Sequence, residues 1–316
     1  AGRVGGTIAQ LAGDLEGLGA SGDLGARIEA WAEAARAADR RLGGLLDRRG
    51  RHGFVRRCHG DLHLANICLW EGEPTPFDAI EFDEAMATID VLYDLAFVLA
   101  DLSFRGADAF ANRLLCRYLE WTRDYAGLAA LPVFASMRAM VRALVAAASG
   151  GDPSGQVALA GRLVAGPGPA RLLAVGGRSG TGKSTLARVL AERTGAVVLR
   201  SDAVRKRLFG RAPEERLPEA AYAEEASRRV YRRMRVDAAR ALRAGFPVVL
   251  DATFLDPDER AAAADLAARA GVAFDGIWLS DGEATLAARL AARAAAGTDA
   301  SDADAAVMRA QRPAAA

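Results

Sequence analysis

The stretch Gly177-Arg178-Ser179-Gly180-Thr181-Gly182-Lys183-Ser184 decides the fold of the C-terminal half of this 316-residue chain. Its spacing, G-x-x-x-x-G-K-S, is the signature of a phosphate-binding loop. The apolar run at residues 172–175 predicts a buried strand before the loop, and residues 185–193 have the apolar spacing of a helix. Strand, glycine loop and helix are the context that the motif requires. This context favours a phosphate-binding loop over a glycine-rich turn that binds nothing.

Each part of this loop has a chemical role in binding a nucleotide. Backbone N–H groups and the positive helix N-terminus can cradle phosphate oxygens, which the backbone can approach closely at Gly182. The Lys183 ammonium can reach the β- and γ-phosphates, and the Ser184 hydroxyl can ligate Mg²⁺. We therefore predict ATP and Mg²⁺ as cofactors. The predicted nucleotide-binding residues of the loop are Gly177, Ser179, Gly180, Thr181, Gly182, Lys183, Ser184 and Thr185.

Strands and helices alternate after the loop. Strands are predicted at residues 196–202, 247–251 and 272–279, and helices at residues 222–244, 257–270 and 285–296. This alternation is typical of an α/β fold with a parallel sheet, in which ligands bind outside the carboxyl ends of the strands. We therefore expect Gly177, Asp202 and Asp251 to lie at one edge of the sheet.

Residues 170–310 resemble the small P-loop kinases, such as gluconate and shikimate kinases, zeta-toxin-like kinases and the kinase domain of polynucleotide kinase. The resemblance implies that Asp202 accepts the proton of the acceptor hydroxyl and that Arg205 holds substrate or phosphate. With Lys183 they form the predicted catalytic set of this half. Asp251 looks like a Walker B carboxylate that holds Mg²⁺, and Arg289 lies where these kinases carry a phosphate-clamping lid. For Asp202 and Asp251 a role as a helix N-cap or turn residue stays open.

The N-terminal half contains His59-Gly60-Asp61-Leu62-His63-Leu64-Ala65-Asn66, which matches the pattern H-G-D-x-H-x-x-N. This is the catalytic loop of the aminoglycoside phosphotransferase and choline kinase group, which residues 1–150 resemble. The resemblance implies that Asp61 is a catalytic base and Asn66 a Mg²⁺ ligand. Glu81 stands where the group has a Mg²⁺-binding aspartate, and residues 94–96 match its structural Asp-Leu-Ala. A hairpin with incidental polar residues is the alternative.

The predicted fold is thus the helical C-lobe of a protein-kinase-like fold followed by a P-loop NTPase domain. We expect the first domain at residues 1–150, a glycine- and proline-rich linker at 151–169, and the P-loop kinase domain at 170–316. No glycine-rich loop or strand lysine of a kinase N-lobe precedes Asp61. The chain also ends before the last strand of a five-stranded P-loop kinase sheet. It resembles a bacterial fusion of two kinase domains that lacks its N-lobe, and we expect a fragment.

Composition excludes few classes of protein. The net charge of +1 gives no argument for a nucleic-acid or anionic-membrane partner, and Arg or Asp interrupts every long apolar stretch. Cys58, Cys68 and Cys116 lack metal-type spacing and fit reduced thiols in a cytoplasmic protein.

The leading hypothesis is an ATP-dependent kinase that phosphorylates a hydroxyl group of a small molecule. One alternative is an ATP-binding regulatory or sensor module, and another is a polynucleotide 5′-hydroxyl kinase. Asp202 and Arg205 favour an enzyme, because a sensor needs no base at the acceptor position. The motifs indicate ATP but leave the acceptor and the oligomeric state open.

Overall fold

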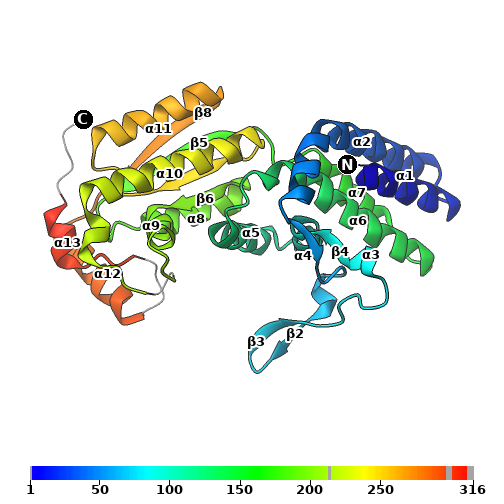
Figure 1. Cartoon of the computed structure of the whole chain (residues 1–316), viewed down its shortest axis with the longest axis horizontal. Helices are drawn as coiled ribbons and strands as arrows, with labels where there is room; N and C mark the ends of the chain where they lie inside the picture. The colour runs from blue at the N-terminus through cyan, green and yellow to red at the C-terminus, as the bar shows by residue number, and fades with distance from the viewer. Residues whose placement is uncertain (1, 213–214, 297–300, 312–316) are drawn as a thin grey trace. The chain divides into compact units, whose positions relative to one another are not determined.

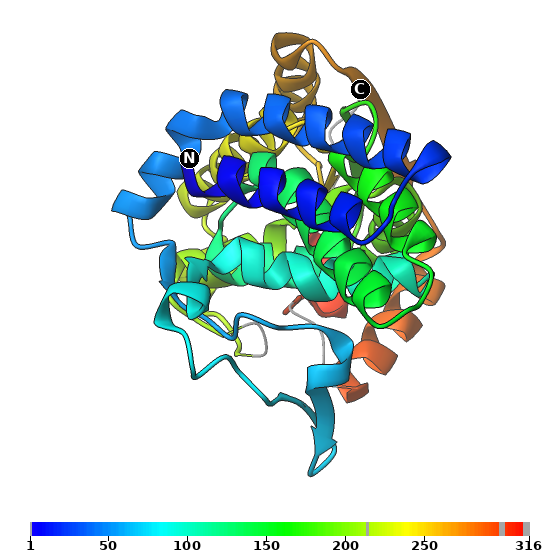
Figure 2. The same ribbon diagram turned by 90° about the vertical axis from the view of Figure 1, so that its right-hand side faces the viewer.

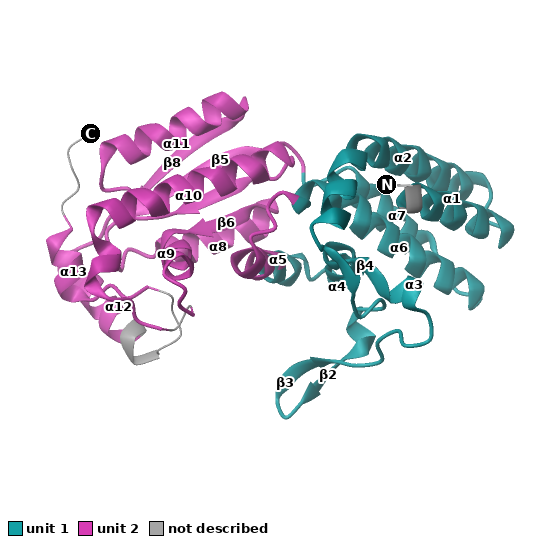
Figure 3. Ribbon diagram, viewed as in Figure 1, with its two compact units in different colours: residues 1–114, 127–167 teal, residues 115–126, 168–316 magenta. Residues whose placement is uncertain are grey.

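The computed structural model describes residues 2–212, 215–296 and 301–311 of the chain (Figure 1). It divides into two compact units, which are coloured separately in Figure 3. Unit 1 comprises residues 1–114 and 127–167, and unit 2 comprises residues 115–126 and 168–316. Unit 1 is mostly helical and unit 2 contains a parallel sheet, so the predicted α/β fold class is confirmed.

Unit 1 is built mainly from helices. They are α1 (Gly2–Gly17), α2 (Gly22–Arg51), α3 (Glu84–Ala87), α4 (Val91–Phe104), α6 (Leu131–Ala148) and α7 (Ser154–Val164), with the short 3₁₀ turns η1 (Leu64–Asn66) and η2 (Gly127–Ala130). Figure 2 shows α1 and α2 side by side over α6 and α7, and these helices contact one another. Trp31 of α2 is buried and donates from its indole nitrogen to the Ser136 hydroxyl of α6 at 3.1 Å. A large apolar ring with a satisfied polar tip thus fixes the two helices together.

Two short antiparallel ladders complete unit 1. Strand β1 (Val55–Arg57) pairs with β4 (Thr88–Asp90), and β2 (Ile67–Trp70) pairs with β3 (Glu73–Pro76). Residues 77–83, which follow β3 and contain Glu81, form no strand. Asp78 has a positive φ of 61°, which a continuous strand does not accommodate. The preceding strand β3 contains Pro74 and Pro76. Both strands of a two-stranded ladder are edge strands, which tolerate proline.

The segment expected to be a linker contains an ordered helix. Helix α7 lies within residues 151–169, and its Val157, Leu159 and Ala160 are buried in unit 1. The apolar face of α7 packs against α2 and α6. This packing stabilises the helix by more than the flanking glycines and prolines destabilise it. Residues 115–126 group with unit 2 instead of with the first predicted domain. The other predicted bounds, those of the first domain and of the P-loop kinase domain, stay predictions.

One helix is more apolar than the sequence led us to expect. The stretch Gly127–Ala148, which comprises η2 and α6, is long and apolar enough to cross a membrane by length and composition. Within the described ranges, however, 67% of its apolar window is buried inside unit 1, as expected for the core helix of a folded domain.

A buried ion pair fixes the end of α2 to the start of α4. The Arg49 guanidinium contacts both carboxylate oxygens of Asp90, at 2.6 and 2.8 Å, and both side chains are less than 9% exposed. Replacing Arg49 with methionine leaves a buried carboxylate without its counter-charge, so we expect unit 1 to lose about 3–5 kcal/mol of stability. Chemical denaturation measures this loss. The control is Arg27→Met on the same helix, whose pair with Asp23 is exposed and should contribute less than about 1 kcal/mol.

Unit 2 has one parallel sheet with helices on both faces. Its strands are β5 (Arg171–Gly177), β6 (Val197–Arg200), β7 (Val248–Asp251) and β8 (Ala273–Leu279), in the order β6-β7-β5-β8. Its helices are α8 (Lys183–Thr194), α9 (Ser201–Leu208), α10 (Glu224–Arg243), α11 (Pro257–Ala270), α12 (Glu283–Ala296) and α13 (Ala305–Ala310), together with the 3₁₀ turn η3 (Glu219–Tyr222) and the end of α5 (Asp108–Thr122).

Strands β5, β6 and β7 are buried on both sides, as their apolar residues require, whereas β8 at one edge of the sheet is partly exposed. Alternate strand residues such as Val175, Val198 and Val249 pack with Ala187 and Ala191 of α8. Helices α10 and α11 contact the strands and each other in the remaining layer of unit 2 (Figure 1). The strands are parallel, so their carboxyl ends share one edge, where Asp251 pairs in register with Arg200 and with Val175.

The three cysteines form no disulfide with one another and lie in different surroundings. Burial raises the pKa of Cys58 to about 11, helped by the nearby charges of Asp94 and Asp90, and burial raises the pKa of Cys116 to about 12. Alkylation needs the thiolate, which at pH 8 is about one in a thousand Cys58 thiols and fewer of Cys116. We expect iodoacetamide at pH 8 to modify the exposed Cys68 first, and intact-mass spectrometry to detect one adduct. Equal labelling of all three would contradict this.

Candidate active site

The phosphate-binding loop links β5 to α8, as the motif predicts. Gly177 has a φ of +138°, and a Cβ there would lie 2.4 Å from the Leu279 carbonyl oxygen. Gly182 has a φ of +90° and caps the N-terminus of α8. The Thr181 hydroxyl closes the loop by donating to the Arg178 carbonyl at 2.8 Å. The loop is therefore held in a conformation that suits a phosphate-binding nest and that glycine adopts without strain.

Lys183 begins α8 and lines the cavity above the loop. Its ammonium donates to the Arg178 carbonyl oxygen at 2.8 Å. Ser184 and Thr185, the next two residues of α8, line the same cavity. The helix N-terminus and the ammonium together make this end of the cavity electropositive, which suits a polyphosphate.

Asp251, at the end of β7, is a buried carboxylate beside the loop. It is 4% exposed, and burial raises its pKa against the opposing effects of Arg200, a hydrogen bond with Ser184 and the Lys183 charge. The Arg200 Nε lies 3.5 Å from its Oδ2. Since α11 begins later and is capped by Asp256, Asp251 is not a helix cap. Its carboxylate and the Ser184 hydroxyl are adjacent oxygen donors of the kind that Mg²⁺ prefers, so this pair fits the predicted metal.

Asp202 lies in the first turn of α9 and lines the same cavity. The N-cap of α9 is Arg200, so the alternative that Asp202 caps this helix is excluded. Within the described ranges, no hydrogen bond or ion pair engages its half-buried carboxylate. An unengaged carboxylate facing the phosphate loop is what a general base requires.

Arg205 and Arg289 also line the cavity, and protein groups hold both. Arg205 is 7% exposed and donates to the Ala221 carbonyl at 2.6 Å. Its guanidinium carbon lies 5.0 Å from the ring centroid of Tyr222. Arg289 is half exposed and pairs with Asp281 at 3.1 Å. The roles predicted for these arginines toward phosphate or substrate stay predictions.

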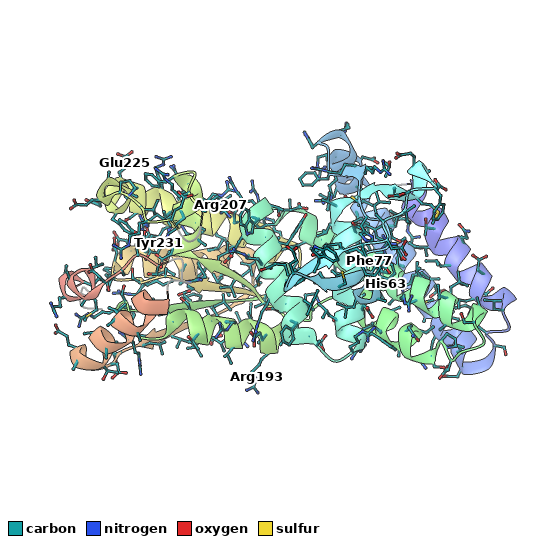
Figure 4. All side chains as sticks on the ribbon, turned by 90° about the horizontal axis from the view of Figure 1, so that it is seen from below. His63, Phe77, Arg193, Arg207, Glu225 and Tyr231 are labelled. Carbon is teal, nitrogen blue, oxygen red and sulfur yellow. The ribbon has the colours of Figure 1, made fainter. Side chains whose placement is uncertain are left out.

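The cavity has a volume of about 520 Å³, and most of the residues that line it belong to no sequence motif. Tyr231 of α10, labelled in Figure 4, contacts Thr253 at 3.3 Å and accepts from the Phe254 backbone N–H at 3.0 Å. Tyr222 and Ser227 line the cavity from η3 and α10. No local motif identifies these residues, because the sheet and α10 bring them beside the loop from distant positions in the chain.

A further wall comes from residues 301–311, which we call the strap. Its Gln311 carboxamide accepts from the Ser179 backbone N–H at 2.8 Å and donates to the Ser179 hydroxyl at 3.0 Å. Arg178 donates to the Met308 carbonyl at 2.8 Å. The strap thus contacts the phosphate loop itself, which the sequence did not predict.

In unit 1 the structure brings two of the three predicted residues together. The Asn66 amide donates to the carbonyl and to the carboxylate of Asp61, at 3.0 and 3.1 Å. His63, labelled in Figure 4, lies 3.4 Å from the same carboxylate. Glu81 is exposed, and in the part of the chain that the structure describes no contact joins it to Asp61 or Asn66. The predicted Mg²⁺ site of unit 1 stays a prediction.

Residues outside the motif hold this loop of unit 1. Asp94, from the Asp-Leu-Ala pattern, accepts from the backbone N–H groups of His59 and Gly60, both at 3.0 Å. Arg138 of α6 donates to the Gly60 carbonyl at 3.0 Å, and Asp101 accepts from the Leu64 N–H at 2.9 Å. Asp94 therefore has a structural role, which is the one implied by the resemblance.

A parallel sheet that places a phosphate-binding loop and two carboxylates at one edge defines unit 2 as a P-loop kinase fold. Comparison with known families agrees. The family described as "AAA domain" matches residues 172–315, and the "Phosphotransferase enzyme family" matches residues 2–131. The chain therefore carries a phosphotransferase-family domain in front of a P-loop kinase domain, which confirms the two resemblances.

Individual relatives are similar over parts of their length. Proteins of Mycobacterium tuberculosis and Mycobacterium bovis, described as uncharacterized, are 34% identical over 235 residues, which are 71% of this chain and 47% of each relative. The chain thus spans about half the length of these relatives. A solved structure from Chloroflexus aurantiacus is 25% identical, with a TM-score of 0.36. The match covers 44% of this chain and 74% of the chain of that structure. A gluconokinase from Sinorhizobium meliloti is 21% identical, with a TM-score of 0.33, and covers 45% and 73%.

Proposed function

We propose that unit 2 is an ATP-dependent kinase that transfers the γ-phosphoryl group to a hydroxyl group of a small molecule. One observation carries this proposal: the Lys183 ammonium, the Ser184–Asp251 oxygen pair and the Asp202 carboxylate all line one cavity at the carboxyl edge of the sheet. Phosphoryl transfer depends mainly on positioning and charge stabilisation, and these groups supply both.

Each group has a distinct task in this proposal. The loop N–H groups and Lys183 bind the phosphates, and Ser184 and Asp251 would hold Mg²⁺. Bound Mg·ATP supplies the phosphoryl group and the cation that offsets its charge. Asp202 takes the proton of the acceptor hydroxyl, because its carboxylate has no competing partner among the described residues.

The volume of the cavity and the net charge of the chain favour a small acceptor. A volume of about 520 Å³ lies within the range typical of small-molecule sites, roughly 300–1,000 Å³. The net charge of +1 provides no general attraction for nucleic acid. We include a cytoplasmic location in the proposal, since ATP is available there.

The test is a screen of hydroxyl-bearing metabolites for ADP formation by the chain with Mg·ATP. Lys183→Ala serves as the control, because it keeps every other group of the cavity. The kinase proposal is supported if the parent chain forms ADP only when an acceptor is present and Lys183→Ala forms none. ATP binding without any acceptor favours the sensor alternative instead. Turnover only with a 5′-hydroxyl oligonucleotide favours a polynucleotide kinase.

A further inference from the structure

Asp302 of the strap belongs to none of the motifs and lies at the centre of a polar cluster in unit 2. One carboxylate oxygen accepts from the Lys206 ammonium at 2.9 Å. The other accepts from the Tyr222 hydroxyl at 2.8 Å and from the Leu217 backbone N–H at 3.0 Å. Its three partners come from α9, η3 and the segment before η3. One side chain therefore joins the strap to α9 and to residues 217–222 of unit 2.

This cluster is buried enough for its charges to matter. Lys206 is 2% exposed, so its ammonium requires a counter-charge, and Asp302 provides it. Burial alone would raise the pKa of Asp302. Hydrogen bonds from Lys206, Leu217 and Tyr222 outweigh burial and hold that pKa below its usual value. Asp302 therefore remains a carboxylate at neutral pH, and the strap is fastened by a charge-assisted contact.

The cluster adjoins the side of the cavity where Asp202 lies. Lys206 is on α9, one helical turn after Asp202. Tyr222 links the Asp302 carboxylate to the Arg205 guanidinium, which stacks over its ring. Ser301 and Ala303, the neighbours of Asp302 in the strap, line the cavity. Fastening Asp302 thus fixes the wall that faces the proposed base.

The other end of the strap is fastened separately. Its helix α13 is capped by Asp304, which accepts from the Val307 N–H at 2.9 Å. Met308 is fully buried and packs with Leu286 and Leu290 of α12. Beyond it, Gln311 reaches the phosphate loop. The strap consequently spans the cavity from the Asp202 side to the loop.

We propose that Asp302 is a positioning residue that fastens the strap to α9 and to residues 215–222, and so closes the acceptor side of the cavity. The location of that side rests on the proposed function. Asp302 touches no reacting atom. It acts through Lys206 and Tyr222, which set the position of the wall and of the helix that carries Asp202.

The first experiment compares amide hydrogen exchange in the chain and in the variants Asp302→Asn and Asp304→Asn. Both carboxylate oxygens of Asp302 accept hydrogen bonds, whereas an asparagine has one accepting oxygen and an NH₂ group. Asp302→Asn therefore loses part of these contacts, and we expect amide exchange to become at least about tenfold faster both in residues 215–222 and in the strap. Strands β5 and β7 should be unchanged. Asp304→Asn is the matched control in the same strap. Since asparagine also caps helices, this variant should leave exchange in residues 215–222 unchanged. Unchanged exchange in residues 215–222 of Asp302→Asn would overturn the proposal.

The second experiment separates positioning from folding. The variant Lys206→Met/Asp302→Asn also removes the buried ammonium, so it keeps unit 2 folded if the single variant does not. Calorimetry with Mg·ATP should give a Kd within about threefold of the parent chain, while KM for an acceptor found in the screen rises at least about tenfold. An unchanged KM would contradict the proposal. If no acceptor is found, the proposed function fails, whereas hydrogen exchange still decides the role of Asp302.

Discussion

Replacing Lys183 with alanine is expected to abolish the thermal stabilisation that Mg·ATP gives to unit 2. The ammonium lines the cavity at the start of α8, and in this motif it is the group that reaches the β- and γ-phosphates. A ligand at one hundred times its Kd stabilises a folded domain by about 2.7 kcal/mol, which is a readily measured shift in Tm. Differential scanning fluorimetry with and without Mg·ATP measures this effect, and an unchanged shift would contradict the assignment of the loop.

The matched control for this variant is Arg188→Ala on the same helix. Arg188 is exposed and pairs with Glu192, one turn further along α8. It should keep the full Mg·ATP shift. The Lys183→Ala variant also reports on unit 1, where we expect calorimetry to find no remaining ATP site. Micromolar binding there would point instead to the loop that contains Asp61 and Asn66.

Asp202→Asn is expected to lower kcat at least about 10²-fold, since general base catalysis typically contributes 10²–10⁴-fold. The amide cannot take a proton from the acceptor, whereas the shape of the side chain is preserved. The carboxylate makes no hydrogen bond with the described residues, so ATP affinity and Tm should change little. Steady-state kinetics with the acceptor from the screen, together with ATP titration calorimetry, measure both quantities.

Asp251→Asn distinguishes the two carboxylates. Asp251 is buried beside Ser184 and Arg200, so its replacement should also raise the Mg²⁺ concentration needed for half-maximal activity. Asp202→Asn should leave that concentration unchanged. If Asp202→Asn mainly unfolded unit 2, or if both variants shifted the Mg²⁺ dependence equally, the base would have to be another residue of the cavity.

The sequence alone determined those parts of the protein that depend on residues close together in the chain. The pattern from Gly177 to Ser184 predicted strand, loop and helix, because the glycines are required by positive φ angles within a few residues. Apolar runs predicted the four strands of unit 2, and parallel pairing then required Asp202 and Asp251 to lie at the same edge as the loop. The Asp-Leu-Ala pattern likewise indicated a structural role for Asp94.

Only the tertiary structure decided which distant groups meet. Packing against α2 and α6 makes residues 154–164 a helix despite the glycines and prolines around them. The contact of Gln311 with Ser179 spans 132 positions in the chain, and that of Asp302 with Lys206 spans 96. Such hydrogen bonds form only after the sheet and its helices are in place, and a single sequence carries no local pattern for them. The chemistry of the phosphate loop is therefore encoded locally, whereas the walls that close around it are set by the fold.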